Sequence, residues 1–355
     1  MKRRTFLFGA AGSAAAATLV ACGGNGGASG GASSAPASGA ATTAAGGGGK
    51  SLDTIRVAHY FNEAHPNHIA LTEVFKPAIE EGSNGTIKVQ VFPNSQLGDE
   101  EAMSNGVRNG TIEMAVPGGL LANADRKIGL VEFPFLFNDY EHGRKALDSE
   151  PGEFVKEAFR GLGAEPLGFS LNGMRVVSSN KAITKLDDFK GFRLRMPNVP
   201  VYIMTGEALG ATVTPMSISE IFTALEQKVI DGQENPYLTV LANKWYEVQS
   251  HMIETYHLLS VNFYLFNQEL YGGLDSETQK LIADASDKSS RHAWDLSVDL
   301  EKTVKGELEG HGMTIIIPDE SFKADLNSAM DGVYEKLYAD YDWAEEQVKK
   351  IKDMA

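Results

Sequence analysis

The chain has 355 residues, of which 43% are hydrophobic, enough to build one large core or two of medium size. Its 47 Asp and Glu residues outnumber its 32 Lys and Arg residues, so the formal net charge is −15. So acidic a surface excludes nucleic acid as a partner, and any site for an anion must carry its own local positive charge.

Residues 1–21 are predicted to form an export signal. A charged start with Lys2, Arg3 and Arg4 precedes an apolar run over 6–21, which is too short and too rich in alanine to span a bilayer stably. The pair Arg3-Arg4 resembles the twin-arginine signal of the pathway that exports folded proteins. We therefore expect the mature protein in the periplasm, on the extracytoplasmic face of the cytoplasmic membrane.

Cys22 is predicted to carry a lipid anchor. The tetrapeptide Leu19-Val20-Ala21-Cys22 resembles the bacterial lipobox, in which the thiol is alkylated by a diacylglycerol before the signal is cleaved. The alternative is a buried or free thiol. Cys22 is the only cysteine, so no intramolecular disulfide is expected.

Residues 22–50 are predicted to be a flexible linker, because Gly, Ala, Ser and Thr cannot bury enough apolar surface to offset chain entropy. Residues 44–51 loosely mimic a phosphate-binding loop, but the first glycine and a preceding strand are missing. Cleavage after residue 21 would remove three basic residues and no acidic ones, leaving 29 against 47, or about −18.

The folded part reads as alternating strands and helices. Apolar periodicity predicts strands over 55–60, 87–91 and 111–116, with helices over 71–79 and 103–107. After Leu162-Gly163 the pattern restarts with strands over 166–169, 175–177 and 192–196. Ser217 and Glu220 form a predicted capping box, and a long helix, kinked or straight, is expected over 276–308. This alternation predicts two α/β halves, each a mostly parallel sheet covered by helices, with the break near residues 170–175.

Enzyme signatures are missing from the sequence. There is no Cys-x-x-Cys, no Gly-x-Ser-x-Gly and no Gly-x-Gly-x-x-Gly after a strand. His65 and His68 are three residues apart, but the pair His65-Pro66 more commonly starts a helix than binds zinc. We expect no catalytic residues, no cofactor and no metal.

Several short motifs occur together and in a fixed order, and they resemble the DctP-like solute-binding subunits of tripartite ATP-independent periplasmic (TRAP) transporters. The resemblance covers roughly residues 52–320. The motifs are Ser95-Gln96-Leu97-Gly98-Asp99-Glu100, Phe133-Pro134-Phe135-Leu136-Phe137, Asn172-Gly173-Met174-Arg175, Leu194-Arg195-Met196-Pro197, Thr214-Pro215-Met216, Asp231-Gly232-Gln233-Glu234-Asn235-Pro236 and Tyr246-Glu247-Val248-Gln249.

The resemblance implies a two-lobed α/β fold of the periplasmic-binding-protein or Venus flytrap kind, with hinge strands and a long helix spanning both lobes. Lobe I is expected to hold residues 51–172 plus about 261–300, and lobe II residues 173–260 plus about 301–355. The implied function is capture of a small organic acid anion, such as a sugar acid or a dicarboxylate, by a monomer that delivers it to the TRAP membrane permease subunits.

The resemblance also implies which residues bind the carboxylate. Arg195 is implied to bind the ligand carboxylate in a bidentate manner, because its planar guanidinium presents parallel N–H donors to both oxygens. Arg175 and Asn235 are implied to assist it, and Asn235 would add a neutral donor. Each has an alternative: a structural salt bridge for the arginines and a turn before Pro236 for Asn235. Arg193 and Arg195 share one face of their strand, so periodicity alone leaves open which of them faces the cleft.

Weaker candidates border the same cleft. Asn172, Glu100 and His59 are placed there because they fall at strand ends or loops. Three aromatic residues at strand ends have two alternative interpretations, as lining of the cleft or as part of the core: Tyr60, Phe61 and Tyr237. Gly118 stands where the sialic-acid branch of the family has an acidic residue, which argues against sialic acid as the ligand.

Two other classes of function are compatible with the sequence. One is a similar lobed receptor for an ATP-binding cassette (ABC) importer or a sensor kinase. The other is an exported lipoprotein enzyme, which would need a nucleophile–base pair or a cofactor motif. Neighbouring genes distinguish the transporters, since TRAP systems have four-helix and twelve-helix membrane subunits and cassette systems have an ATPase.

Overall fold

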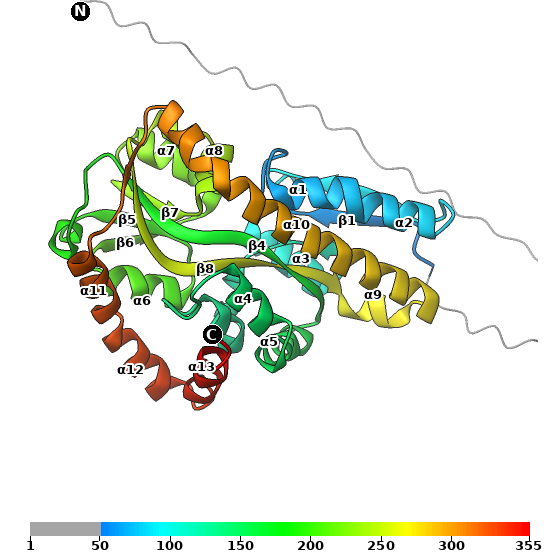
Figure 1. The fold of residues 1–355 in the computed structure, drawn as a ribbon. Helices are drawn as coiled ribbons and strands as arrows, with labels where there is room; N and C mark the ends of the chain where they lie inside the picture. The colour runs from blue at the N-terminus through cyan, green and yellow to red at the C-terminus, as the bar shows by residue number, and fades with distance from the viewer. Residues whose placement is uncertain (1–50) are drawn as a thin grey trace, which may run out of the picture. The chain divides into compact units, whose positions relative to one another are not determined.

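A computed structural model describes residues 51–355 of the chain. The export signal, Cys22 and the linker lie outside these residues. The described part contains one mixed β-sheet of nine strands with helices on both faces (Figure 1). Eight strands follow the spatial order β2-β1-β3-β8-β4-β7-β5-β6, and β9 pairs with β8. The strands are β1 Thr54–Ala58, β2 Lys88–Phe92, β3 Met114–Ala115, β4 Ala164–Ser179, β5 Arg193–Met196, β6 Thr212–Pro215, β7 Gly232–Asn235, β8 His251–Asn267 and β9 Thr314–Ile316.

The centre of the sheet is a long antiparallel pair formed by β4 and β8. Its ladder runs from Ala164 opposite Asn267 to Ser179 opposite His251. The two strands predicted over 166–169 and 175–177 are therefore the two ends of one strand, and Asn172-Gly173 lies inside it rather than in a turn. Both strands pass through the middle of the described part in Figure 1.

Parallel units are attached at the two ends of this pair. At one end β1 pairs in parallel with β2 and β3, and at the other β5 pairs in parallel with β6 and β7. Helical crossovers join each set, as parallel pairing requires. The predicted mostly parallel halves thus exist, joined by antiparallel strands. We call the part around β1–β3 the first lobe and the part around β5–β7 the second lobe.

The helices begin where the sequence offers caps. Ser217 and Glu220 form the predicted capping box in front of α7, which ends at Glu226. The helices and helical turns are α1 Pro66–Ala70, η1 Leu71–Phe75, α2 Lys76–Gly82, α3 Glu100–Asn109, η2 Gly119–Asn123, η3 Arg126–Glu132, α4 Tyr140–Leu147, α5 Glu150–Gly161, η4 Leu186–Phe189, α6 Pro200–Ala208, η5 Ile218–Glu220, α7 Ile221–Glu226, α8 Tyr237–Ala242, η6 Trp245–Glu247, α9 Gln268–Gly273, α10 Ser276–Gly310, α11 Glu320–Ser328, α12 Asp331–Asp340 and α13 Ala344–Lys352.

The long predicted helix is α10, which is continuous over 35 residues and packs against β4, α1 and α8 (Figure 1). Its apolar face contributes Ile282 to the core of the first lobe, Trp294 to a core along the opposite face of the sheet, and Leu308 to the core of the second lobe. It therefore ties both lobes together. Of the helices in residues 51–355, none combines the length and apolar character needed to cross a bilayer.

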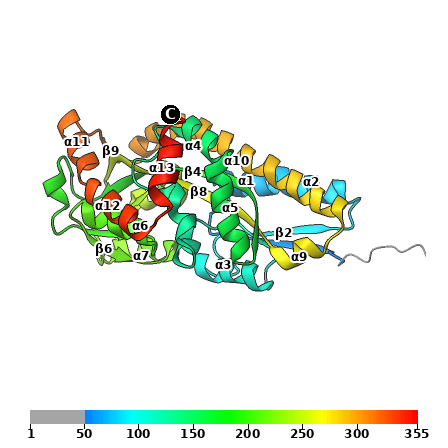
Figure 2. The same cartoon turned by 90° about the horizontal axis from the view of Figure 1, so that it is seen from below.

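The C-terminal helices also run between the lobes (Figure 2). α11 contacts β8 and η4, α12 contacts α6, and α13 contacts α5 and η3 of the first lobe. The predicted division places all of 301–355 in lobe II, whereas α13 itself lies against the first lobe. The lobe boundaries otherwise stay a prediction.

The ladder between β4 and β8 is irregular at its middle. Arg175 lies opposite Leu258 but Val177 opposite Ile253, so residues 254–257 of β8 bulge out of register. Nearby, Gly173 has a φ of 133°, and a Cβ there would stand 2.7 Å from the Cβ of Pro236. These irregularities fall where both strands pass from one lobe to the other, as expected of a hinge.

Gly173→Ala should lower the free energy of unfolding by about 1–3 kcal/mol, because alanine is strained at this φ and collides with Pro236. Gly306→Ala is the control: its site in α10 is open, so helix propensity should stabilise the protein by about 0.5–1 kcal/mol. Urea titration of both variants measures the difference. A Gly173→Ala variant as stable as the parent would contradict the steric reading of this position.

Candidate functional site

Arg195 lies at the C-terminal end of β5, where the strand leaves the sheet toward the cleft between the lobes. Its side chain is only 3% exposed. Nε and Nη2 both donate to the carbonyl oxygen of Met216, at 3.0 and 2.7 Å. Within the described residues it has no ion pair with a carboxylate. Burial lowers its pKa to about 10, so the guanidinium is still charged at neutral pH.

Arg175 comes from the middle of β4 and is equally buried, but its charge is paired with Glu234 of the neighbouring β7. Nε and Nη2 bind the two carboxylate oxygens, Nη2 also binds the Glu234 carbonyl at 2.7 Å, and Nη1 binds Ser260 at 3.3 Å. Burial acts to raise the pKa of Glu234, but Arg175 outweighs it and the pKa lies below its usual value. The pair is therefore ionised on both sides.

The first lobe contributes Glu100, the first residue of α3. Its Oε1 accepts a hydrogen bond from the Leu120 amide at 3.1 Å. Burial raises the pKa of Glu100, while that amide and then the charges of Arg195 and Arg175 oppose the rise. A Cβ at Gly118 would stand 3.2 Å from Glu100 Oε1 and 3.4 Å from the hydroxyl of Tyr60. The glycine thus leaves space beside both polar groups.

Neutral polar side chains join the two lobes at the same place. Asn172 donates to Ser260 at 3.2 Å and accepts from Thr239 at 3.2 Å. Asn235, next to Glu234 in β7, donates to Gln233 at 2.6 Å. The structure therefore brings Arg195, Arg175, Glu100 and Asn172 to one interlobe region, whereas the side chain of Asn235 contacts Gln233 instead. The use of any of these residues by a ligand stays a prediction.

His59 belongs to a separate aromatic cluster. Its Nε2 lies 3.1 Å from Nδ1 of His68, and its ring packs against Phe61. Burial lowers the pKa of His59 to about 3, so the imidazole is neutral at pH 7. Phe61 and Tyr237 are core residues, whereas Tyr60 is half-buried and accepts a hydrogen bond from Asn262.

Three residues that the sequence did not single out complete the buried network. Glu234 holds Arg175, Tyr202 of α6 places its ring 5.1 Å from the Arg175 guanidinium carbon, and Glu132 of η3 accepts the Tyr202 hydroxyl at 2.8 Å. A signal was present for Glu132, since it interrupts the apolar run between Ile128 and Phe137. An acid in such a run is buried only with a partner.

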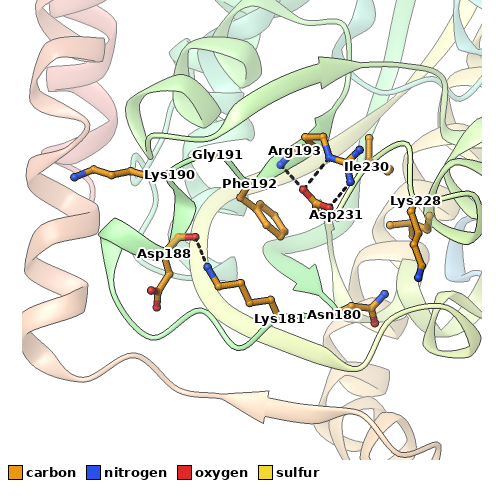
Figure 3. A pocket seen from close by; sticks show the side chains of 11 residues that line it. Asn180, Lys181, Asp188, Lys190, Gly191, Phe192, Arg193, Lys228, Ile230 and Asp231 are labelled. Carbon is orange, nitrogen blue, oxygen red and sulfur yellow. Dashed lines mark hydrogen bonds and ion pairs between the residues drawn. The ribbon is translucent and has the colours of Figure 1, made fainter.

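Two cavities of similar volume lie at opposite ends of β5. One, of about 370 Å³, opens between the lobes and is lined by Glu100 and Leu120 from the first lobe and by Arg195, Met216 and Ile218 from the second. The other, of about 390 Å³, lies at the N-terminal ends of β5 and β7 and contains Arg193, paired with Asp231 at its outer rim (Figure 3). The two arginines of β5 thus face different cavities. Arg195 is the one that faces the cleft.

The interlobe cavity is suited to a carboxylate. Among residues 51–355 no carboxylate forms an ion pair with the buried Arg195, and a ligand carboxylate would supply a counter-ion together with two parallel acceptors. The C-terminal ends of the parallel strands β5 and β6 border the cavity, and open α/β sheets bind their ligands at this end of their strands.

Comparison with known proteins gives the family. Residues 57–340 match the family described as bacterial extracellular solute-binding protein, family 7. The chain belongs to this family.

Two relatives and one solved structure illustrate the similarity. A TRAP periplasmic solute-binding protein from Haemophilus influenzae, solved with bound L-gulonate, is 39% identical with a TM-score of 0.83, over 85% of this chain and 99% of that one. The 2,3-diketo-L-gulonate-binding periplasmic protein YiaO of Escherichia coli is 32% identical over 74% of this chain and 80% of its own. The C4-dicarboxylate-binding periplasmic protein DctP of Vibrio cholerae is 32% identical over 64% of this chain and 69% of its own. The predicted family and two-lobed α/β fold are confirmed.

Glu234→Gln should lower the free energy of unfolding by about 3–5 kcal/mol, because it leaves the buried Arg175 charge without its carboxylate. Asp231→Asn is the matched control. It breaks the Arg193 pair, whose side chains are 44% and 36% exposed, and should cost no more than about 1 kcal/mol. Chemical denaturation of both variants tests this, and equal losses would contradict the contrast between the two pairs.

Proposed function

We propose that this protein is the solute-binding subunit of a TRAP transporter, and that it captures a sugar acid and delivers it to a membrane permease. The observation that carries the proposal is Arg195, which is buried, charged and without a carboxylate partner among the described residues. The L-gulonate-bound relative and YiaO support a sugar acid as the class of ligand.

A C4-dicarboxylate is the second candidate, supported by the relative from Vibrio cholerae. The charges of the site favour a monocarboxylate. Arg175 is already neutralised by Glu234, so Arg195 is the one buried arginine of the described chain that is left for a carboxylate. A second carboxylate would meet the field of Glu100 without a free cation, whereas the hydroxyl groups of a sugar acid can bind polar groups of either charge.

The proposed roles follow from position. Arg195 binds the carboxylate through its two free Nη1 donors and the remaining Nη2 donor. Arg175 supports this field and offers its remaining Nη1 donor, and Asn235 and Asn172 add neutral polar groups. Glu100 lies on the first-lobe side of the cavity, where it can accept hydrogen bonds from the hydroxyl groups of the ligand. His59 lies in its own cluster, so we propose for it only an indirect role at the edge of the cleft.

The proposed partners are the two membrane subunits of a TRAP permease, and the proposed location is the extracytoplasmic face of the membrane, with a lipid anchor at Cys22 and a monomeric receptor. Several relatives are named periplasmic proteins. A receptor for an ABC importer or a sensor would share the fold and be distinguished by an ATPase or kinase gene beside it. A lipoprotein enzyme has the least support, because family and structural neighbours are solute-binding transport proteins.

Arg195→Lys should weaken L-gulonate binding by roughly ten- to a hundredfold, since losing a charge-assisted hydrogen bond in a desolvated cleft costs about 1.5–3 kcal/mol. Arg193→Lys is the control in the same strand. Arg193 lines the other cavity and pairs with Asp231. The affinity of the Arg193→Lys variant for L-gulonate should therefore differ from that of the parent by less than about threefold. Titration calorimetry measures both, and circular dichroism confirms that both fold.

The same titrations decide the class of ligand. L-gulonate should bind the parent protein and succinate should bind at least tenfold more weakly, by about 1.4 kcal/mol. Tighter binding of succinate would favour the dicarboxylate reading. If neither arginine variant altered binding of any acid, the carboxylate site at Arg195 would be wrong.

Cys22→Ser should release the protein from the membrane without changing ligand affinity, because the anchor and the receptor are separated by the linker over 23–50. Membrane fractionation of cells that express each form, followed by calorimetry on the soluble fraction, gives both readouts. A serine variant that stays in the membrane pellet would refute the anchor.

A further inference from the structure

Glu132 is a buried acid with one unpartnered oxygen. It is 1% exposed, its Oε1 accepts a hydrogen bond from the Tyr202 hydroxyl at 2.8 Å, and its Oε2 has no hydrogen-bond partner in the part of the chain that the structure describes. Oε2 lies so close to Gly119 that a Cβ at that glycine would stand 1.9 Å away. The carboxyl is thus wedged between η2 of the first lobe and α6 of the second.

Tyr202 links this acid to the arginines. Its side chain is 2% exposed, and its ring lies 5.1 Å from the guanidinium carbon of Arg175, a cation–π contact. The hydrogen bond from the Tyr202 hydroxyl to Glu132 therefore holds in place the ring that contacts the guanidinium of Arg175. The line Glu132–Tyr202–Arg175 runs from η3 through α6 to the hinge strand β4.

The charged and titratable groups that face Glu132 come from four elements: Tyr202 on α6, Arg175 on β4, Glu100 on α3 and Glu234 on β7. Burial raises the pKa of Glu132 to about 8, Tyr202 and Arg175 oppose the rise, and the two carboxylates add to it. Glu132 is therefore a neutral acid at pH 7 in this arrangement.

We propose that Glu132 is a positioning residue for Arg175 that works as a neutral carboxylic acid: it anchors the Tyr202 hydroxyl across the two lobes when they close around the ligand. The inference rests on the proposed function, because it concerns the closed, ligand-bound arrangement of that same site. Lobe opening moves η3 away from α6 and returns the Glu132 carboxyl to water. Closure then takes up one proton.

The sign of the pH dependence follows. An acid whose pKa is higher in the closed form than its ordinary value of 4.5 must be protonated on closure. Affinity is then highest at low pH, falls by up to tenfold per pH unit as pH rises toward about 8, and levels off above it.

Calorimetry with L-gulonate from pH 6 to 9 tests the inference on the parent protein and on Glu132→Gln, whose amide keeps the shape and an acceptor oxygen but does not titrate. The parent should lose affinity across this range and take up close to one proton per ligand at pH 7, measured in buffers of different ionisation enthalpy. Glu132→Gln should bind with a nearly flat profile and no uptake from this site. Other titratable groups are present in both proteins, so their contributions cancel in the comparison.

Tyr202→Phe supplies a second readout, because it keeps the ring and removes only the hydroxyl. It should weaken binding at pH 6 by about two- to tenfold, the value of one buried hydrogen bond. Identical pH profiles for the parent and Glu132→Gln, or parental affinity in Tyr202→Phe, would overturn the inference while leaving the sugar-acid assignment intact. Failure of the parent to bind any organic acid would defeat both.

Discussion

The antiparallel pairing of β4 with β8 is the constraint on which the rest of the structure depends. Each strand is long enough to belong to both lobes, so a parallel α/β unit grows from each end of one continuous ladder. The polar groups of the site lie where the strands cross from lobe to lobe, beside Asn172 and Arg175. A change in twist at the bulge over 254–257 therefore moves the lobes and the site together.

The two buried arginines have different electrostatic roles. Arg175 forms a pair with Glu234 whose charges compensate within the protein, so it contributes a fixed local field and a rigid floor. Arg195 has only a carbonyl oxygen as acceptor and lies at the open end of its strand. A protein with a net charge of −15 can attract an anion only through such a site, because its long-range field repels the ligand.

Local patterns predicted the ends of the sheet and much of the site. The capping box at Ser217 and the long helix α10 are local signals, and the ordered set of short motifs, of which the one around Arg195 is a member, indicated the family. The 17-residue strand β8 was not predicted, because polar residues interrupt its apolar residues and obscure the period of a strand. These polar residues are Glu254, His257, Ser260 and Asn262. Periodicity alone left the choice between Arg193 and Arg195 open, and only the resemblance to the family favoured Arg195. Both lie on one face of the strand, and the structure separates them, because Arg193 pairs with Asp231, the residue before β7, whereas Arg195 lines the interlobe cavity.

Burial of Arg195 also explains why closure should depend on ligand. A guanidinium that is 3% exposed and has no carboxylate partner within the described residues costs free energy in the closed arrangement, whereas an open cleft returns it to water. A bound carboxylate removes that cost only when the lobes are shut, so it stabilises the closed form selectively. Hydrogen bonds that cross between the lobes, such as Asn123 to the Asn198 carbonyl at 2.6 Å, then need to contribute little themselves. Opening and closing of the lobes therefore depend on whether the buried charge of Arg195 is compensated. The strands β4 and β8 and the helix α10, which belong to both lobes, couple this site to the movement of the lobes.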